Sequence, residues 1–320
     1  GAYEICWLYC TIHLGYNVVM NDKFHMSLPE NIFLAKKILV QNIYNSAKLE
    51  GVNTTFPETE AILGGVNVPT AKLSDIQVIL NLRDAWNFML NTIESDINLD
   101  FIEKLNGFIS RNESLDWGHL RAGNIGISGT GYKPAIPVRK NVAENITKIV
   151  SDTTRSATEK ALDLFLAIIY GQIFWDGNKR TATLAANAVL IKSGAGILSV
   201  SDKNIVKFNG LLTVLYDTGD TATLKNFLYE TAVIDFSADF TVHRDVPLNV
   251  PENVPLNPTE KNVLSMISEN PSLTADEIAL AIGKTRKTAQ RATAALKSRG
   301  IIARVGSSKS GYWLVSREKI

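Results

Sequence analysis

Cysteine and long hydrophobic runs are both scarce in this sequence of 320 residues. The two cysteines, Cys6 and Cys10, have the spacing of neighbours on one helix, and no further ligands accompany them. We therefore expect neither a disulfide framework nor a structural zinc site, and a reducing cytoplasm is the expected compartment. The longest nearly apolar run, Leu164 to Trp175, contains a glycine and a glutamine and is too short to span a bilayer, so we expect no membrane partner.

An excess of charge of either sign is also missing. The 33 Lys and Arg residues against 32 Asp and Glu residues leave a net charge of +1, so attraction to nucleic acid must come from a local patch. The apolar opening, residues 1–16, has no basic start and no small-residue cleavage site, so a signal peptide is not expected. A hydrophobic content of 45% supports a sizeable core, and the length predicts two domains.

The most informative stretch is QIFWDGNKRTA, residues 172–182. Ahead of it, apolar side chains recur at helical spacing, at Leu162, Phe165, Leu166 and Ile169. A second helix is predicted to begin near Asn178, because Gly177 permits a tight turn and the first amides beyond it have no intrahelical partner. Such amides bind phosphate, and Lys179 and Arg180 add positive charge. A helical corner with a solvated basic pair is the alternative interpretation.

This stretch resembles the signature of the Fic/Doc family, which reads His, any residue, Phe, any residue, Asp or Glu, Gly or Ala, Asn, Gly or Lys, Arg. The matching positions are Phe174, Asp176, Gly177, Asn178, Lys179 and Arg180. Family members typically transfer AMP from ATP to a hydroxyl group on a protein. The resemblance implies that Asp176 holds Mg²⁺ and that Asn178 contacts the α-phosphate. It also implies that the amides of Gly177 and Lys179 contact phosphate oxygens, and that Arg180 binds the outer phosphates.

The sequence departs from the family at two positions. Gln172 stands where the family has the histidine that accepts the target's proton, and Thr183 stands where many members have a second arginine. An amide is not basic, and losing a positioned general base typically costs a factor of about 10² to 10⁴ in rate. His119 could supply a base only if the fold brings it to the site, and a surface histidine is the simpler interpretation. The catalytic position is therefore predicted to be degenerate.

A second segment, SAKLEG, resembles the inhibitory segment of Fic proteins, in which Ser or Thr is followed four residues later by Glu and then by Gly or Asn. Ser46, Glu50 and Gly51 match it. In that family the glutamate projects into the phosphate site, where a carboxylate beside a triphosphate costs electrostatic energy. The usual partner of this glutamate is the missing second arginine, so Arg180 or the helix amides are expected to replace it. The alternative is an ordinary helix end with Gly51 after it.

Between these segments, Arg121 to Pro137 is rich in glycine and contains short β-prone pieces. We predict a β-hairpin or flap. By resemblance such a flap lines the cleft and pairs with the protein target by main-chain hydrogen bonds, here through Ile125, Gly126, Ile127 and Ser128. A plain surface hairpin is an equally good interpretation.

Near the C-terminus, residues 235–257 lose helical periodicity and contain three evenly spaced prolines, which predicts an extended linker. Capping signals at 257–260 and 274–277, a helix near 285–298 and two strands at 301–305 and 312–315 then resemble a winged helix domain. Residues 284–309 include eight basic side chains and no acidic one. In winged helices the second helix of the pair enters the major groove, which would bring to DNA the side chains of Arg286, Lys287, Gln290 and Arg291. A purely protein-binding winged helix is equally compatible.

The predicted fold is mainly α, with a Fic-type helical bundle, a small β-hairpin flap and a C-terminal winged helix-turn-helix domain. The predicted divisions are an N-terminal helical region with the inhibitory helix (1–110), the Fic core (111–234), the linker (235–257) and the winged helix domain (258–320). Two functions compete. One is an autoinhibited Fic-type AMP transferase that binds ATP and Mg²⁺ and modifies an unknown protein. The other is a degenerate member that senses a nucleotide and acts through its winged helix on DNA or a partner. A homodimer is compatible with both.

Overall fold

The computed structural model describes residues 20–237, 256–298, 301–305 and 312–315. Cys6, Cys10 and residues 238–255 of the predicted linker lie outside these ranges, as does the predicted turn at 306–311. The chain divides into two compact units, residues 1–242 and 243–320, with the division inside the predicted linker, and each unit is described by itself.

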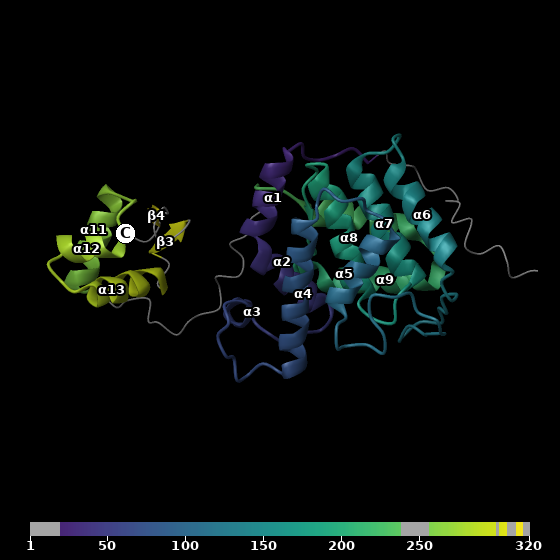
Figure 1. The fold of residues 1–320 in the computed structure, drawn as a ribbon, viewed down its shortest axis with the longest axis horizontal. Coiled ribbons are helices and arrows are strands. Elements are labelled where there is room, and N and C mark those ends of the chain that lie inside the picture. The colour runs from purple at the N-terminus through teal and green to yellow at the C-terminus, as the bar shows by residue number, and fades with distance from the viewer. Residues whose placement is uncertain (1–19, 238–255, 299–300, 306–311, 316–320) are drawn as a thin grey trace, which may run out of the picture. The chain divides into compact units, whose positions relative to one another are not determined.

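The N-terminal unit is a bundle of helices with one small sheet (Figure 1). Its first five helices are α1 (Leu28–Lys37), α2 (Leu39–Leu49), α3 (Phe56–Leu63), α4 (Leu73–Asn91) and α5 (Leu99–Ile109). The next three are α6 (Arg139–Ser151), α7 (Ala157–Gly171) and α8 (Asn178–Lys192). Strand β1 (Ile197–Leu198), a 3₁₀ turn (Asp202–Asn204), α9 (Ile205–Thr218), α10 (Thr221–Ala232) and strand β2 (Val233–Ile234) complete the unit.

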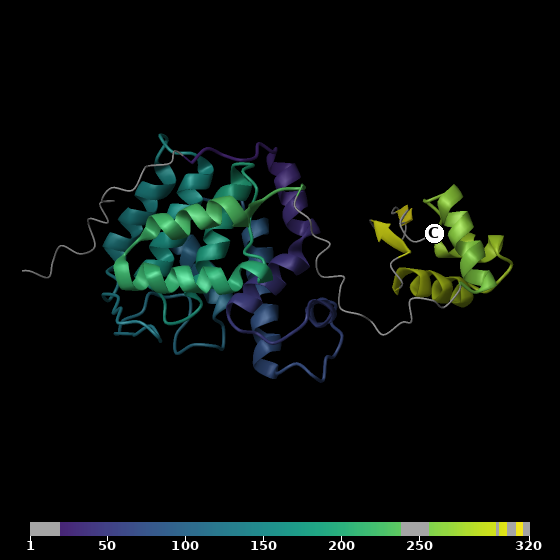
Figure 2. The same ribbon diagram turned by 180° about the vertical axis from the view of Figure 1, so that it is seen from behind.

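Helix α8 lies at the centre of this bundle. Every one of its residues except Lys179 and Lys192 is buried, and it packs against α7, α5, α4, α1, α2 and β1. Figure 1 shows helices on both sides of it, and Figure 2 shows the same bundle from behind. A helix buried all round must be small or apolar on every face, and the alanines of the sequence TATLAANAV meet this requirement. The segment that carries the motif is therefore held from several directions.

Local sequence signals explain where several helices begin. Ser27 with Glu30 and Thr55 with Glu58 form complete capping boxes at α1 and α3, and Ser156 caps α7. The strands β1 and β2 pair antiparallel, with Ile197 opposite Ile234. One hydrophobic core runs from Met20 to Val233 and includes residues from both the predicted 1–110 region and the predicted 111–234 region. The proposed boundary between those regions remains a prediction.

The glycine-rich segment does not form the β-hairpin that we predicted. Residues 121–138 contain no strand, and their main regular feature is a turn in which the amide of Thr130 donates to the carbonyl of Ile127. The cause is Arg121, whose buried guanidinium donates to the carbonyls of Gly123, Pro134 and Ala135, at 2.6, 3.2 and 2.5 Å. Carbonyls that converge on one side chain are not available to a strand partner, so the segment is a loop.

The C-terminal unit has the predicted winged helix fold. Helices α11 (Pro258–Glu269), α12 (Ala275–Ala281) and α13 (Arg286–Ser298) are followed by the antiparallel strands β3 (Ile302–Val305) and β4 (Tyr312–Val315). Both predicted capping boxes are present, at Asn257 with Glu260 and at Thr274 with Glu277. The unit has its own hydrophobic core, centred on Val263, Ile267 and Leu296. The indole of Trp313 joins the strands to the helices by donating to the carbonyl of Leu273 at 2.9 Å.

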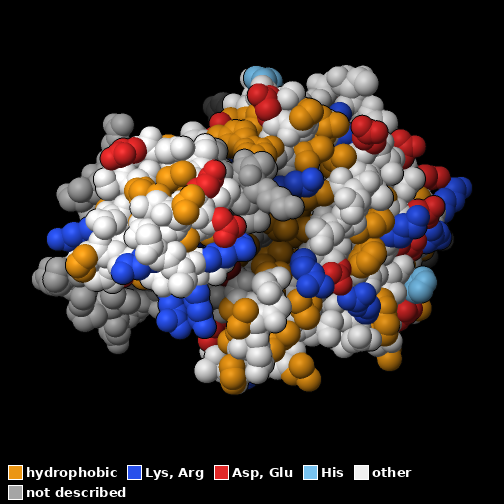
Figure 3. All heavy atoms as spheres, turned by 60° about the vertical axis from the view of Figure 1, so that its left-hand side comes forward, with side chains coloured by type: hydrophobic (Ala, Val, Ile, Leu, Met, Phe, Trp, Pro, Cys, Tyr) orange, Lys and Arg blue, Asp and Glu red, His pale blue; other side chains and the backbone are white. Residues whose placement is uncertain are grey.

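Charges of both signs are interspersed on the visible surface, with hydrophobic side chains between them (Figure 3). This agrees with the net charge of +1 and leaves recognition of a charged ligand to local clusters. Among the described helices, none combines the length and apolarity that a membrane crossing needs.

Candidate functional site

The turn between α7 and α8 is built by two left-handed residues. Gln172 follows the last residue of α7 as its C-cap, with φ 43°, and Gly177 precedes α8 with φ 72°. A side chain at position 177 would lie 2.3 Å from the hydroxyl of Ser110, so glycine is required by both its conformation and its surroundings. Asn106 and Ser110 of the α5 end donate to the carbonyl of Asp176, at 3.0 and 3.1 Å. These contacts fix the turn against α5.

Asn178 and Phe174 stabilise the inside of the same turn. The Phe174 ring is fully buried. The side chain of Asn178 accepts from the Phe174 amide at 3.0 Å and donates to the Phe174 carbonyl at 2.9 Å. No side chain caps the N-terminus of α8, in contrast to the hydroxyl caps of α1, α3 and α7. The helix therefore begins with amides that face the turn and favour an anion.

Gln172 fills the position of the family's histidine with a fully engaged amide. Its Nε2 donates to the carbonyl of Ile169 at 2.8 Å and to the hydroxyl of Tyr216 at 2.9 Å. Its Oε1 accepts from Asn178 at 3.2 Å. Burial raises the pKa of Tyr216 to about 12, against the lowering effect of the Gln172 hydrogen bond and with a smaller raising effect from the charge of Glu50. Tyr216 is therefore protonated at neutral pH and does not supply a base.

The described histidines, His25 and His119, are both exposed on the surface. The His119 side chain is 72% exposed and its Nδ1 lies 3.0 Å from the carboxylate of Asp116. This matches the surface interpretation of His119. Thr183, at the position of the second family arginine, is buried and donates to the carbonyl of Lys179 at 2.9 Å, so it acts within the helix.

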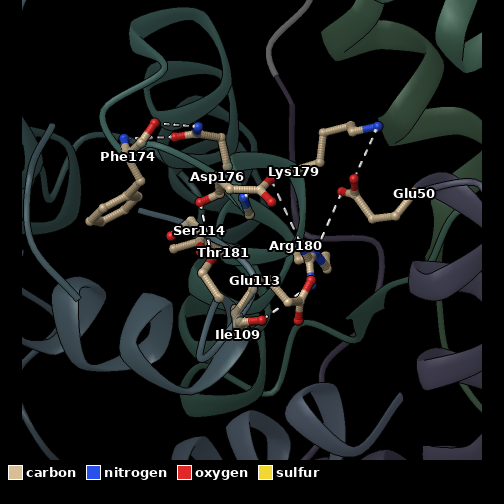
Figure 4. Close-up of polar contacts among 12 residues, drawn as sticks. Glu50, Ile109, Glu113, Ser114, Phe174, Asp176, Lys179, Arg180 and Thr181 are labelled. Atoms are coloured by element: carbon tan, nitrogen blue, oxygen red, sulfur yellow. Dashed lines mark hydrogen bonds and ion pairs between the residues drawn. The ribbon is translucent and has the colours of Figure 1, made fainter. Parts of the chain in front are cut away.

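Arg180 is the central charge of the site, and three carboxylates surround it (Figure 4). Its side chain is only 3% exposed. It forms a close ion pair with Glu113, at 2.9 Å from Nη1, and Nη1 also donates to the carbonyl of Ile109 at 3.1 Å. Glu50 lies 3.7 Å from Nε and Asp176 lies 3.8 Å from Nη2, both beyond hydrogen-bond distance.

Glu50 is the C-cap residue of α2 and projects toward the motif. It lies between Lys179 and Arg180, with Oε2 at 3.6 Å from Lys179 Nζ and Oε1 at 3.7 Å from Arg180 Nε (Figure 4). Lys179 also donates to the carbonyl of Leu49 at 2.8 Å, at the end of α2. Ser46 is buried on the same helix. Gly51 follows Glu50 directly and has a φ of 79°. The structure thus brings the segment 46–51 and the motif together.

Asp176 is the most exposed of the charged side chains around Arg180, with 47% of its side chain exposed. Its Oδ1 accepts from the amide of Gly177 at 2.6 Å. In the described residues no group of three or more His, Cys, Asp or Glu side chains is arranged to hold a metal ion. A single carboxylate nevertheless suits Mg²⁺, which commonly takes one or two carboxylates and completes its shell with water and substrate phosphates.

Three side chains that contact Arg180 or Gln172 were not predicted from the sequence. Glu113 lies in the turn after α5, Tyr216 comes from α9, and Arg121 donates from Nε to the carbonyl of Gln172 at 2.6 Å. Each acts through a contact across more than 40 residues of sequence, which no local pattern signals. The predicted docking residues Ile125, Gly126, Ile127 and Ser128 lie in the loop that Arg121 organises, and Trp175 packs against Gly123 at its start.

The winged helix unit presents a second candidate site. The predicted contact residues Arg286, Lys287, Gln290 and Arg291 are all exposed, on the side of α13 opposite its buried Ala289, Ala292 and Leu296. Arg286 pairs with the exposed Asp276 at 3.2 Å. This face is the only strongly basic helical face of the described part of the C-terminal unit, since α11 and α12 carry most of its acidic side chains.

Comparison with known proteins agrees with both units. Residues 96–190 match the family model described as the Fic/DOC family, and residues 256–303 match that described as winged helix-turn-helix DNA-binding. No match was found among curated proteins. The fold is similar to that of Fic-1 from C. elegans, with a TM-score of 0.56 and 18% identity over 68% of this chain. It is also similar to a Fic domain containing signaling protein from Bacteroides thetaiotaomicron, with a TM-score of 0.55 and 18% identity over 64% of this chain.

The chain spans 64% of the C. elegans structure and 86% of the Bacteroides structure. At this identity the likeness establishes the fold. The matched residues 96–190 contain the whole turn from Gln172 to Arg180, its supporting helix α5, its flanking helix α7 and all but the last two residues of α8. Residues 96–190 are thus a Fic/DOC family domain, and residues 256–303 are a winged helix-turn-helix domain.

Proposed function

We propose that the N-terminal unit binds ATP at the start of α8, in the manner of the protein AMPylation family, and that it is degenerate for transfer. One observation carries this proposal: Gln172, a side chain without basicity, has all its polar atoms engaged inside an otherwise ordered anion-binding turn. The left-handed Gly177, the hydrogen bond of Asn178 to Phe174 and the contact of Arg180 with Glu113 support phosphate binding at this turn. Binding without a general base is the outcome that this arrangement favours.

In this proposal the amide of Lys179 contacts phosphate oxygens, the amide of Gly177 does so in place of its present bond to Asp176, and Asn178 lies beside the α-phosphate. Arg180 binds the outer phosphates through its free edge. Asp176 would hold Mg²⁺, which would neutralise phosphate charge when bound. Phe174 keeps the turn in place from the core side. The preference for ATP over another nucleotide rests on the family.

Glu50 is proposed to inhibit this site. Its carboxylate lies against the two cations that a triphosphate would use, Lys179 and Arg180. A γ-phosphate in the same place would meet like charge where the side chains of Arg180 and Glu50 are largely buried. The protein target remains unknown. The exposed Gly126 and Ser128 in the loop after Arg121 are proposed to offer main-chain groups to it.

The test is transfer of labelled phosphate to protein, with α-label and γ-label ATP used separately. Four forms of the full chain are compared: native, Gln172→His, Glu50→Gly and the double variant. We expect binding without transfer in the native form, and transfer of α-label once Gln172→His supplies a base, strongest in the double variant. Transfer by the native form at the rate of the double variant would show that the site is not degenerate.

The alternative function is a regulator that senses a nucleotide and binds DNA through its winged helix. The exposed basic face of α13 favours it, because a helix that only packs against protein does not need four polar, mainly cationic positions on one side. Binding to mixed duplex DNA at low salt is its test, since phosphate contacts are strongest there. Undetectable binding under those conditions would eliminate it.

A further inference from the structure

Arg180 is held at one end of its guanidinium group and open at the other. Nη1 has two acceptors, Glu113 Oε2 and the carbonyl of Ile109. Nε is buried and makes no hydrogen bond, and neither does the Glu50 Oε1 that lies 3.7 Å from it. The edge formed by Nε and Nη2 therefore faces Glu50 and Asp176 at ion-pair distances of 3.7 and 3.8 Å and makes no hydrogen bond to either (Figure 4).

The residue that holds Arg180 is itself fixed by α4. Asn81 is completely buried, and its Nδ2 lies 2.6 Å from Glu113 Oε1. The same nitrogen lies 2.8 Å from the carbonyl of Arg111 and 3.3 Å from that of Ile109. Gln77 donates to the Oδ1 of Asn81 at 2.8 Å, which sets the orientation of the amide. Asn81 thus fixes the turn that supplies both acceptors of Nη1.

We infer that Glu113, fixed by Asn81, is a positioning residue that directs the Nε and Nη2 edge of Arg180 toward the outer phosphates of a nucleotide. This inference rests on the proposed nucleotide site. A guanidinium binds an oxyanion best through two parallel N–H groups, and that geometry requires the plane of the group to be fixed before the ligand arrives. Glu113 also compensates a cation that would otherwise be buried at high cost.

The two glutamates beside Arg180 therefore have opposite effects. Glu50 has no hydrogen bond to Arg180 and occupies the side on which a phosphate would bind. Glu113 is bonded to the opposite end and leaves that side open. Removal of Glu50 is expected to raise the affinity for a triphosphate, and removal of Glu113 is expected to lower it.

The experiment is calorimetric titration of Mg-ATP and of AMP into the full chain, with Glu50→Gly as the common background. Adding Glu113→Ala is expected to weaken ATP binding about 10-fold, the value of one charge-assisted hydrogen bond, and to change AMP binding less than about twofold. Glu113→Gln keeps an acceptor oxygen and is expected to fall between. With Arg180→Gln already present, Glu113→Ala is expected to have no further effect on ATP.

The matched control is Glu103→Ala. Glu103 is as buried as Glu113, with 12% against 14% of the side chain exposed, and it also pairs with an arginine, Arg139. It should leave ATP affinity unchanged. Tighter ATP binding by the Glu113→Ala variant, or equal losses for ATP and AMP, would overturn the inference, because the first indicates a second inhibitory charge and the second a general structural role.

A measurement without nucleotide separates this inference from the proposed function. A guanidinium held at Nη1 rotates slowly, so the Nη nitrogens of Arg180 should give separate NMR signals in the native chain. These signals should merge in Glu113→Ala and persist in Glu103→Ala. Signals that stay separate in Glu113→Ala would overturn the inference, whereas merged signals in a chain that binds no ATP would refute the proposed nucleotide function and leave the Arg180 contact established.

Discussion

Tyr216 joins α9 to the turn through its bond to Gln172, and its ionisation provides a test of that contact. Its folded pKa of about 12 exceeds the unfolded value of about 10, so the folded state retains the proton over a range in which the unfolded state releases it. The raised pKa therefore adds to the free energy of unfolding. This contribution is complete below pH 10 and is lost as the pH rises from 10 to 12. Its upper limit is about 2 to 3 kcal/mol, from about 1.4 kcal/mol for each pKa unit.

The expected result concerns Tyr216→Phe. Between pH 10 and 12 the native protein should lose stability more steeply than the variant. The difference between their free energies of unfolding, measured with urea, should therefore narrow as the pH rises. Tyr229→Phe is the control, since the Tyr229 hydroxyl donates only to the carbonyl of Asn21 and is not near the turn. If the free energies of unfolding of the native protein and of Tyr216→Phe changed in parallel with pH, the raised pKa of Tyr216 would be contradicted.

Gly177 offers a second test on a single residue, because two costs of replacing it can be separated. Gly177→Ala would adopt an unfavourable positive φ and would also bring its methyl group against Ser110 and Ile109. Gly129 has a similar φ of 80° but no atom within 4 Å of the new methyl group. Gly129→Ala should therefore cost about 1 kcal/mol, and Gly177→Ala should cost at least about 1 kcal/mol more. Chemical denaturation measures both, and equal losses would argue against the close approach to Ser110.

At the scale of helices and turns, the sequence predicted those elements that are determined by residues close together in the chain. The capping pairs at 257–260 and 274–277, the glycine turn before Asn178 and the helical spacing in α7 are local signals, and the structure confirms the elements that they predicted. Glu113 and Arg180 are 67 residues apart, and their contact depends on how α5 packs on α8. The hairpin prediction for 121–137 failed for the same reason, since Arg121 redirects carbonyls that a local pattern would assign to a ladder.

The end of α2 is attached to α8 by Lys179, which gives a prediction for this pair of helices. Its ammonium group binds the last carbonyl of α2 and lies beside Glu50. Lys179→Met should loosen the final turn of α2 and accelerate amide hydrogen exchange in residues 47–52 about two- to fivefold, the value of a cation at a helix C-terminus. Lys192→Met is a matched control, because Lys192 donates to the carbonyls of Glu94 and Ser95 elsewhere. Unchanged exchange near Glu50 would show that Lys179 does not stabilise the inhibitory position.

At the scale of the whole molecule, two units with separate cores share one chain. If nucleotide binding to one unit affects DNA binding to the other, thermodynamic linkage makes the effect reciprocal. If ATP changes the affinity of the full chain for duplex DNA by some factor, DNA must change the affinity for ATP by the same factor. Both titrations can be made with the Glu50→Gly form, in which the nucleotide site is expected to be accessible. Equal factors that differ from one would support the regulator, and a factor of one in both directions would mean that the two units act independently.

The DNA-binding prediction depends on where charge lies rather than on how much there is. Changing Arg286, Lys287 and Arg291 to Gln lowers the net charge from +1 to −2, since three cations are removed. Changing the exposed Lys72, Lys104 and Lys203 of the N-terminal unit has the same effect on net charge. Only the first triple variant should lose affinity for mixed duplex DNA. The plot of log affinity against log salt concentration should become shallower, by about 0.9 in slope for each phosphate contact removed. Equal losses in both triple variants would mean that DNA responds to net charge alone, which would exclude α13 as a specific DNA-binding face.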